Sequence, residues 1–143
     1  SSKYVVAASD GEIIKHIFNK DFDLKTIILE KQPKLKLGDP QRAKVNLIIY
    51  SSNRVKFKVS SDANTLLFLS DAYYPGWNVY IDSVKNNILR ADYALRAVEI
   101  PSGDHTVEFR FEPLSFKIGL IISVISFAIF AIFILYSAKN RRF

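Results

Sequence analysis

Cysteine is absent from this chain of 143 residues, and histidine is scarce. Without cysteine there can be no disulfide framework, no thiol nucleophile and no thiolate metal site. The two histidines, His16 and His105, lie in different segments and have no metal-ligand spacing. We therefore expect no metal site and no bound cofactor.

Catalytic motifs are also missing. The sequence contains no phosphate-binding glycine loop, no HExxH and no nucleophile motif. An acidic pair such as Asp21 and Asp23 has the chemistry of a general acid and base, but aspartates this close together more often shape a turn. We interpret the chain as a binding or structural region without catalytic residues of its own.

Charge is almost balanced outside the C-terminal segment. The net charge is +6, yet residues 1–116 hold 16 basic and 14 acidic side chains. Such a surface gives no reason to expect nucleic acid as a partner. Residues 31–58 hold eight basic side chains against Asp39 alone. This run is either a solvated face or a surface attracted to anionic lipid headgroups or to a polyanionic polymer.

One long apolar run is present near the C-terminus. Residues 118–136 carry no charge, and these 19 residues, at about 1.5 Å each, span the roughly 30 Å hydrocarbon core of a bilayer. We expect a transmembrane helix over residues 114–138 and a basic tail over residues 139–143. Basic residues in that tail favour a cytoplasmic C-terminus in the cell membrane, with the preceding domain extracytoplasmic.

The first residues lack the pattern of a signal peptide. Two alternatives follow for the export of the domain. The chain is either the C-terminal piece of a longer multi-span protein, or a tail-anchored protein whose domain stays in the cytosol. The basic tail favours the first alternative, in which the partners are the lipid bilayer and the rest of the multi-span protein.

Alternation of apolar and polar residues dominates from residue 43 onward. Val55, Phe57 and Val59 alternate with basic residues, which is typical of a strand with one buried face. Short runs of this kind, separated by turn signals, predict an antiparallel β-sandwich of jelly-roll or immunoglobulin-like type over residues 43–113. The expected strands are residues 4–8, 26–30, 43–50, 55–59, 66–70, 77–82, 88–91, 95–100 and 106–111.

Residues 1–42 form a separate segment in this interpretation. Its pattern predicts a strand, a short amphipathic helix over residues 10–18 and a second strand, all packing on the sandwich. Ser9 followed by Glu12 is typical of a capping box at the start of that helix.

Residues 70–80, SDAYYPGWNVY, are the most informative stretch of the sandwich. Pro75-Gly76 predicts a tight turn between two strands, next to two tyrosines and the only tryptophan, Trp77. These rings either fill one end of the core or form a surface platform that stacks on a sugar or another partner.

Residues 88–98, ILRADYALRAV, are expected to face that turn with two arginines, an aspartate and a tyrosine. They form either a polar ligand site or an internal ion-pair network. In the second case Asp71 and Asp92 accept hydrogen bonds from backbone amides or pair with Arg90 and Arg96. The candidate ligand or acceptor contacts are Asp71, Tyr73, Tyr74, Trp77, Arg90, Asp92, Tyr93 and Arg96.

Together these residues resemble the C-terminal end of the YfhO family of bacterial membrane proteins. The family pattern ends a strand in Ser-(Asp/Glu)-x-Tyr-Tyr-Pro-Gly-Trp, which residues 70–77 match. It continues with Arg-Ala-Asn-Tyr-x-x-Arg-Ala, which residues 90–97 match except for Asp92 in place of Asn. It closes with Pro-x-Gly-x-His and Pro-x-Ser-Phe before a last membrane helix, matched by residues 101–105 and 113–116.

The resemblance implies a fragment of a long multi-span protein similar to the lipid-linked-sugar glycosyltransferases of the C superfamily. Such proteins are associated with glycosylation of cell-envelope polymers from a polyprenyl-phosphate sugar donor. The catalytic acidic residue of that superfamily lies in an early extracytoplasmic loop that is not in this sequence, so no catalytic residue is assigned here.

Two functions follow from this interpretation. The first is an extracytoplasmic accessory domain that contacts an envelope glycopolymer or packs on the transferase. The second is a non-enzymatic, membrane-anchored module that binds carbohydrate or protein. Membrane topology distinguishes them, because only the first requires the domain to lie outside the cytoplasm.

Overall fold

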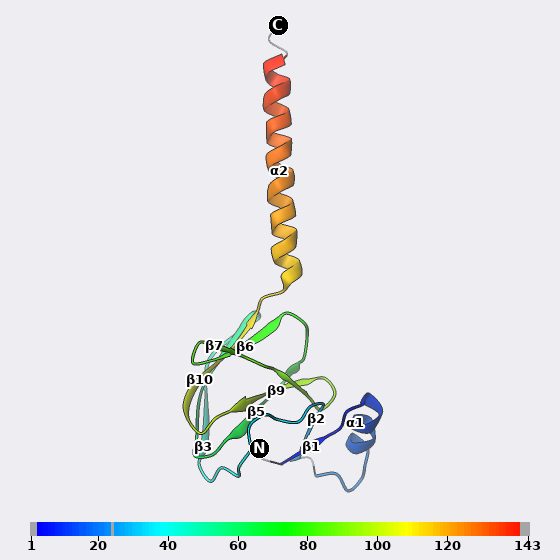
Figure 1. Cartoon of the computed structure of the whole chain (residues 1–143), viewed down its shortest axis with the longest axis vertical. Helices are drawn as coiled ribbons and strands as arrows, with labels where there is room; N and C mark the ends of the chain where they lie inside the picture. The colour runs from blue at the N-terminus through cyan, green and yellow to red at the C-terminus, as the bar shows by residue number, and fades with distance from the viewer. Residues whose placement is uncertain (1–2, 24, 141–143) are drawn as a thin grey trace. The chain divides into compact units, whose positions relative to one another are not determined.

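The computed structural model describes residues 3–23 and 25–140, in two compact units of residues 1–111 and 112–143. The first unit is mainly β, as predicted, with one short helix near its N-terminus (Figure 1). Its elements are β1 (Tyr4–Val6), α1 (Asp10–Ile17), β2 (Ile27–Leu29), β3 (Ala43–Ser51), β4 (Arg54–Ser61), β5 (Thr65–Ala72), β6 (Trp77–Ile81), β7 (Val84–Asn86), β8 (Leu89–Ala91), β9 (Leu95–Ile100) and β10 (Gly103–Phe111).

Two five-stranded sheets build this unit. The first sheet has the order β1-β2-β8-β9-β5, and the second sheet has the order β3-β4-β10-β6-β7. Neighbouring strands are antiparallel, except that β1 and β2 are parallel. Apolar side chains of β4, β6 and β10 meet those of β5 and β9 to form the main core. Its buried members are Val55, Val59, Leu67, Leu69, Val79, Ile81, Val98, Ile100, Val107 and Phe109.

The first sheet is buried on both faces, which explains the unbroken apolar run in β5. Leu67 belongs to the main core, whereas Leu66 belongs to a second cluster with Ala97 of β9. Leu37, from the connector between β2 and β3, packs against that second cluster. A third cluster joins Ile13 of α1 to β2. Residues before β3 therefore extend the first sheet and cover part of it.

The helix α1 begins as its sequence predicts. Ser9 is the N-cap, and its Oγ accepts the backbone N–H of Glu12 at 3.3 Å. The Glu12 carboxylate accepts the N–H of Ala8 at 3.1 Å rather than that of the N-cap residue itself. The interaction is a capping box displaced by one residue, and it ties the helix to the preceding strand.

Two strands differ most from the predicted ones, and the ends of the others differ by at most two residues. β7 (Val84–Asn86) is not among the expected strands, because three residues with two polar side chains carry no readable alternation. β10 begins at Gly103 instead of Thr106, because residues 103–105 still pair with β4. β3 forms where expected, but Val45 and Leu47 are 49% and 57% exposed, because this strand lies at the edge of its sheet.

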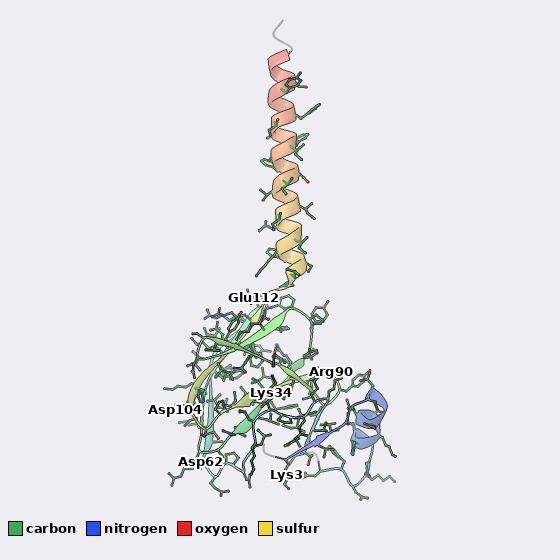
Figure 2. The ribbon with its side chains drawn as sticks, in the orientation of Figure 1. Lys3, Lys34, Asp62, Arg90, Asp104 and Glu112 are labelled. Atoms are coloured by element: carbon green, nitrogen blue, oxygen red, sulfur yellow. The ribbon has the colours of Figure 1, made fainter. Side chains whose placement is uncertain are left out.

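The second unit is the helix α2 (Leu114–Asn140), whose side chains project on every side (Figure 2). Its segment Leu114–Ile134 is long and apolar enough to cross a membrane, as predicted. Two residues, Glu112 and Pro113, connect β10 to this helix. Arg141 and Arg142 of the predicted basic tail lie outside the described residues.

Candidate functional site

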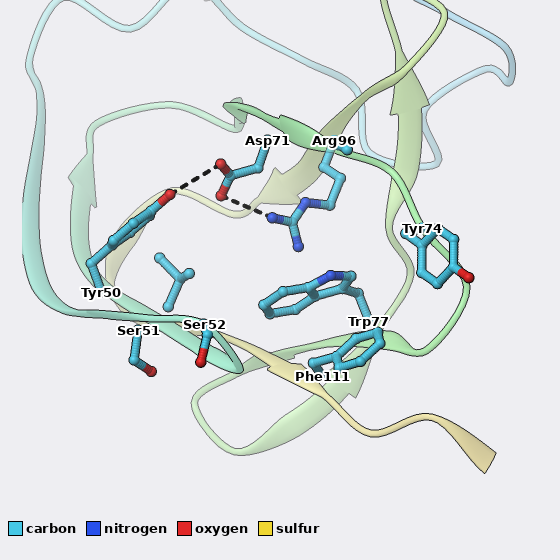
Figure 3. Close-up of a pocket in the computed structure, with 10 residues that line it drawn as sticks. Tyr50, Ser51, Ser52, Asp71, Tyr74, Trp77, Arg96 and Phe111 are labelled. Atoms are coloured by element: carbon cyan, nitrogen blue, oxygen red, sulfur yellow. Dashed lines mark hydrogen bonds and ion pairs between the residues drawn. The ribbon is translucent and has the colours of Figure 1, made fainter. Parts of the chain in front are cut away.

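A cavity of about 490 Å³ lies where several strands begin or end (Figure 3). The end of β3, the end of β5, the start of β6, the start of β9 and the end of β10 all contribute to it. We call it the Trp77 pocket. Its lining residues are Tyr50, Ser51, Ser52, Val55, Asp71, Ala72, Tyr74, Trp77, Arg96 and Phe111.

Arg96 is the most deeply buried polar residue of the pocket, with a side chain only 2% exposed. Its Nη2 donates a hydrogen bond to Oδ2 of Asp71 at 2.9 Å. Burial lowers the pKa of the guanidinium, and the Asp71 carboxylate opposes that shift. Within the described part of the chain, its Nε and Nη1 are buried and have no hydrogen-bond partner. A buried donor without a partner costs free energy, so this arginine can donate further hydrogen bonds to a bound acceptor.

Strand pairing explains why Arg96 points between the sheets. Arg96 lies opposite the core residue Leu69 of β5. On β9 it shares the core-facing side with Val98 and Ile100, which follow it by two and four residues. Asp71 follows Leu69 by two residues, at an irregularity in the β5–β9 register. Asp71 also accepts a hydrogen bond from the hydroxyl of Tyr50 at 3.3 Å. The predicted pairing of this aspartate with an arginine is confirmed.

Trp77 is both a core residue and a wall of the pocket. It is half-buried and packs against the main core. The Arg96 guanidinium carbon lies 4.3 Å from the indole centroid, and the Phe111 ring lies 5.4 Å from it (Figure 3). The indole is therefore already covered by two neighbours. The exposed rings at the pocket are Tyr50 and Tyr74, which are 67% and 63% exposed.

Three of the predicted contacts lie elsewhere, in a network beside β2 and α1. The Nη1 of Arg90 lies 2.5 Å from a Glu30 carboxylate oxygen and 3.3 Å from a carboxylate oxygen of Asp10. Its Nε donates to the backbone carbonyl of Tyr93, and its guanidinium carbon lies 4.9 Å from the Tyr93 ring centroid. Asp92 accepts the N–H of Ile28 at 2.8 Å. Burial raises the pKa of the Asp92 carboxyl.

This Arg90 network joins the β8–β9 turn to β2 and to the start of α1 through internal contacts. It matches the ion-pair alternative for residues 88–98, and the backbone hydrogen bond expected of Asp92 is confirmed. Tyr73 lines a different, smaller cavity with Asn86 and Asn87. The structure thus brings together Asp71, Tyr74, Trp77 and Arg96 in the Trp77 pocket. Tyr73 shares the neighbouring cavity with Tyr74 and Trp77, and Arg90, Asp92 and Tyr93 lie in the separate Arg90 network.

Sequence reasoning missed the far wall of the Trp77 pocket. Tyr50, Ser51 and Ser52 come from the β3–β4 hairpin, and Phe111 ends the last strand. No local motif links these segments to Trp77, because only the order of strands in the second sheet brings them together. In residues 3–23 and 25–140 no group of three or more His, Cys, Asp or Glu side chains is placed to hold a metal ion.

Comparisons with known proteins agree with the sequence patterns. A model of the family described as "Bacterial membrane protein YfhO" matches residues 21–123. The protein named "Uncharacterized protein YfhO" of Bacillus subtilis (strain 168) is 30% identical over 83 residues. That alignment covers 58% of this chain and 10% of the Bacillus protein, so the chain spans a small part of this relative. No solved structure matches the chain.

Proposed function

Because the chain belongs to the YfhO family of bacterial membrane proteins, we propose that its β-unit is the extracytoplasmic C-terminal accessory domain of a glycosyltransferase-like membrane protein. In this proposal α2 is the last membrane helix, and the C-terminus is cytoplasmic. The whole protein would transfer a sugar from a lipid-linked donor to a cell-envelope polymer. The β-unit would hold the acceptor polymer and supply no catalytic residue.

The Trp77 pocket carries this proposal. Its volume of about 490 Å³ lies within the ordinary range of small-ligand sites, which combine apolar walls with a few placed polar groups. Sugars present apolar C–H faces and a ring of hydroxyls. The exposed rings of Tyr50 and Tyr74 can stack on the C–H faces, and the carboxylate oxygens of Asp71 can accept hydrogen bonds from the hydroxyls. The unpaired Nε and Nη1 of Arg96 would donate hydrogen bonds to a sugar hydroxyl oxygen that reached them.

A pair of neighbouring tyrosines offers a matched test. Tyr74 lines the Trp77 pocket, whereas Tyr73 does not, and both are exposed. Tyr74→Ala, introduced into the protein in its own cells, should lower the sugar content of purified envelope polymer several-fold. Tyr73→Ala should leave it close to the wild-type value. Ser52→Trp, which fills the pocket from an exposed hairpin position, should act like Tyr74→Ala.

Immunoblotting against residues 1–111 checks that each variant reaches the membrane at the wild-type level. If Tyr74→Ala and Ser52→Trp both leave envelope glycosylation unchanged at that level, the pocket does not hold the acceptor. If deletion of the whole gene also leaves it unchanged, the glycosyltransferase proposal fails. A non-enzymatic interaction module, which the exposed strand β3 favours as a second candidate, would then explain the chain better.

A further inference from the structure

The Trp77 pocket holds one positive and one negative side chain. Among its ten lining residues, only Asp71 and Arg96 carry a charge at neutral pH. Oδ2 of Asp71 lies 2.9 Å from Nη2 of Arg96, so the two charges compensate each other. The pocket as a whole is therefore electrically neutral. A charged ligand would add an ion without a counterion beside this buried pair, and that is costly.

Two aromatic rings hold the guanidinium of Arg96 in place. Its carbon lies 4.3 Å from the ring centroid of Trp77 and 5.3 Å from that of Phe109. Such contacts between a cation and a ring face fix the position of the guanidinium, and with it the directions of its N–H groups. Its Nε and Nη1, which have no hydrogen-bond partner among the described residues, can only donate hydrogen bonds.

Asp71 supplies the opposite kind of group. Its Oδ1 accepts the hydroxyl of Tyr50 at 3.3 Å, and its Oδ2 accepts Nη2 of Arg96 at 2.9 Å. An ionised carboxylate can only accept hydrogen bonds, and both oxygens have room for a further donor. The side chain is 31% exposed, so a ligand in the pocket can reach it. Groups that only donate and groups that only accept therefore lie side by side.

This arrangement limits the chemistry of the ligand. A carboxylate or a phosphate can satisfy Arg96, but it would also lie against the negative charge of Asp71. An ammonium group can satisfy Asp71, but it would lie against the positive charge of Arg96. A hydroxyl both accepts and donates hydrogen bonds and carries no charge. Neighbouring hydroxyls of a sugar ring therefore complement both side chains.

We propose that the Trp77 pocket selects an uncharged sugar residue and excludes sugars that carry a carboxylate, phosphate or ammonium group. The inference rests on the proposed function and names the class of acceptor unit that the pocket holds. Stacking on the exposed rings of Tyr50 and Tyr74 would favour charged and uncharged sugars alike. The discrimination comes from the Arg96–Asp71 pair, which repels an ion of either sign.

The fluorescence of Trp77 gives a direct test in the full chain, because it is the only tryptophan and lies against Arg96. The chain is kept in a detergent without sugar headgroups. The probes are the methyl glycosides of glucose, galactose and mannose, each compared with its uronic acid and its 2-amino form. At about pH 6 the amine and the carboxyl of these sugars are both ionised.

We expect at least one neutral glycoside to bind with a saturable change in fluorescence. Both of its charged counterparts should bind roughly tenfold more weakly, or worse. A charged counterpart that bound as tightly as the neutral sugar would overturn the inference. Absence of saturable binding by every neutral glycoside would overturn it as well.

Asp71→Asn tests the origin of the selectivity. The variant keeps the size of the side chain but leaves the charge of Arg96 without its counterion. The ratio of uronic acid binding to neutral sugar binding should therefore rise by roughly tenfold. An unchanged ratio in a variant with the circular dichroism spectrum of the wild type would overturn the inference. If the variant does not fold, the comparison of sugars on the wild type still decides.

Two exposed tyrosines locate the bound sugar. Tyr50 lines the Trp77 pocket but not the neighbouring cavity, and Tyr73 lines the neighbouring cavity but not the Trp77 pocket. Tyr50→Ala should weaken the binding of the neutral glycoside several-fold, and Tyr73→Ala should leave it unchanged. The reverse result would place the sugar in the neighbouring cavity and overturn the inference.

The inference and the proposed function can fail separately. If a neutral glycoside binds as expected but Tyr74→Ala leaves envelope glycosylation unchanged, the selectivity of the pocket stands and the proposed function is contradicted. If charged sugars bind as tightly as neutral ones while Tyr74→Ala lowers envelope glycosylation, the proposed function stands and the inference is overturned.

Discussion

At the scale of single residues, the least predictable feature of the site is how the buried charge of Arg96 is paired. The alternation in β9 shows that Arg96 shares a face with Val98 and Ile100, so its inward direction could be predicted from sequence. The sequence does not show that Asp71 accepts a hydrogen bond from only one of the three guanidinium nitrogens of Arg96. That arrangement depends on a register irregularity between β5 and β9.

Asp71→Ala should therefore destabilise the β-unit. It leaves Arg96 buried without its carboxylate, and breaking a buried pair on one side costs about 2 kcal/mol or more even where one partner keeps some contact with water. The measurement is chemical unfolding of the full chain in detergent, followed by fluorescence of Trp77, which lies against Arg96. The double variant Asp71→Ala with Arg96→Met should recover most of the loss. Equal losses in the single and double variants would contradict this explanation.

Glu108 should give the β-unit a sensitivity to acid. Hydrogen bonds from the side chain of Arg110, and then of Arg54, lower its pKa from 4.5 to about 2. A carboxyl with a lowered pKa in the folded state stabilises it above the unfolded pKa, and this contribution is lost as pH falls from 4.5 toward 2.

Glu108→Gln tests that assignment. The variant should unfold more easily than the wild type at pH 7, and the difference between the two should shrink below pH 4.5. Unfolding midpoints measured at several pH values between 7 and 2 would show it. A difference that stayed constant over this range would mean that the carboxylate charge is not what stabilises the second sheet.

Among the secondary-structure elements, the β6–β7 and β8–β9 hairpins have turns that the sequence does not reveal. Asp82 and Ser83 join β6 to β7 with φ values of 48° and 71°. In the three-residue turn between β8 and β9, Asp92 and Tyr93 have φ values of 44° and 73°. Such left-handed pairs normally contain glycine or asparagine. In both turns the aspartate instead accepts a backbone N–H from another strand, at 2.8 Å from Thr106 and at 2.8 Å from Ile28.

Ser83→Gly should stabilise the β6–β7 hairpin. Glycine removes the cost of a left-handed residue at φ 71°, and the greater freedom of the unfolded chain offsets part of the gain, leaving about 0.5 kcal/mol. The thermal midpoint of the full chain should rise slightly. Ser83→Val, at the same exposed position, should lower it. A fall with glycine would show that the serine side chain itself stabilises the turn.

Alternation identifies which residues of a strand share a face, but not whether a second layer covers that face. This is why the buried faces of β4 and β10 could be predicted from alternation, whereas the exposure of β3 could not. The same limit applies to the Trp77 pocket. Its floor could be predicted from residues 70–77 and 90–97, whereas Tyr50 and Phe111 enter it only through the strand order of the second sheet.

At the scale of the whole molecule, the proposed function depends on the orientation of α2. Basic residues after the apolar segment favour a cytoplasmic C-terminus, which would place the β-unit outside the cytoplasm. Lys20→Cys should then react with a membrane-impermeant maleimide in intact cells. A cysteine added after Phe143 should react only after lysis.

The reverse labelling pattern would place the β-unit in the cytoplasm. The Trp77 pocket could then not reach an extracytoplasmic acceptor, which would contradict the proposed function.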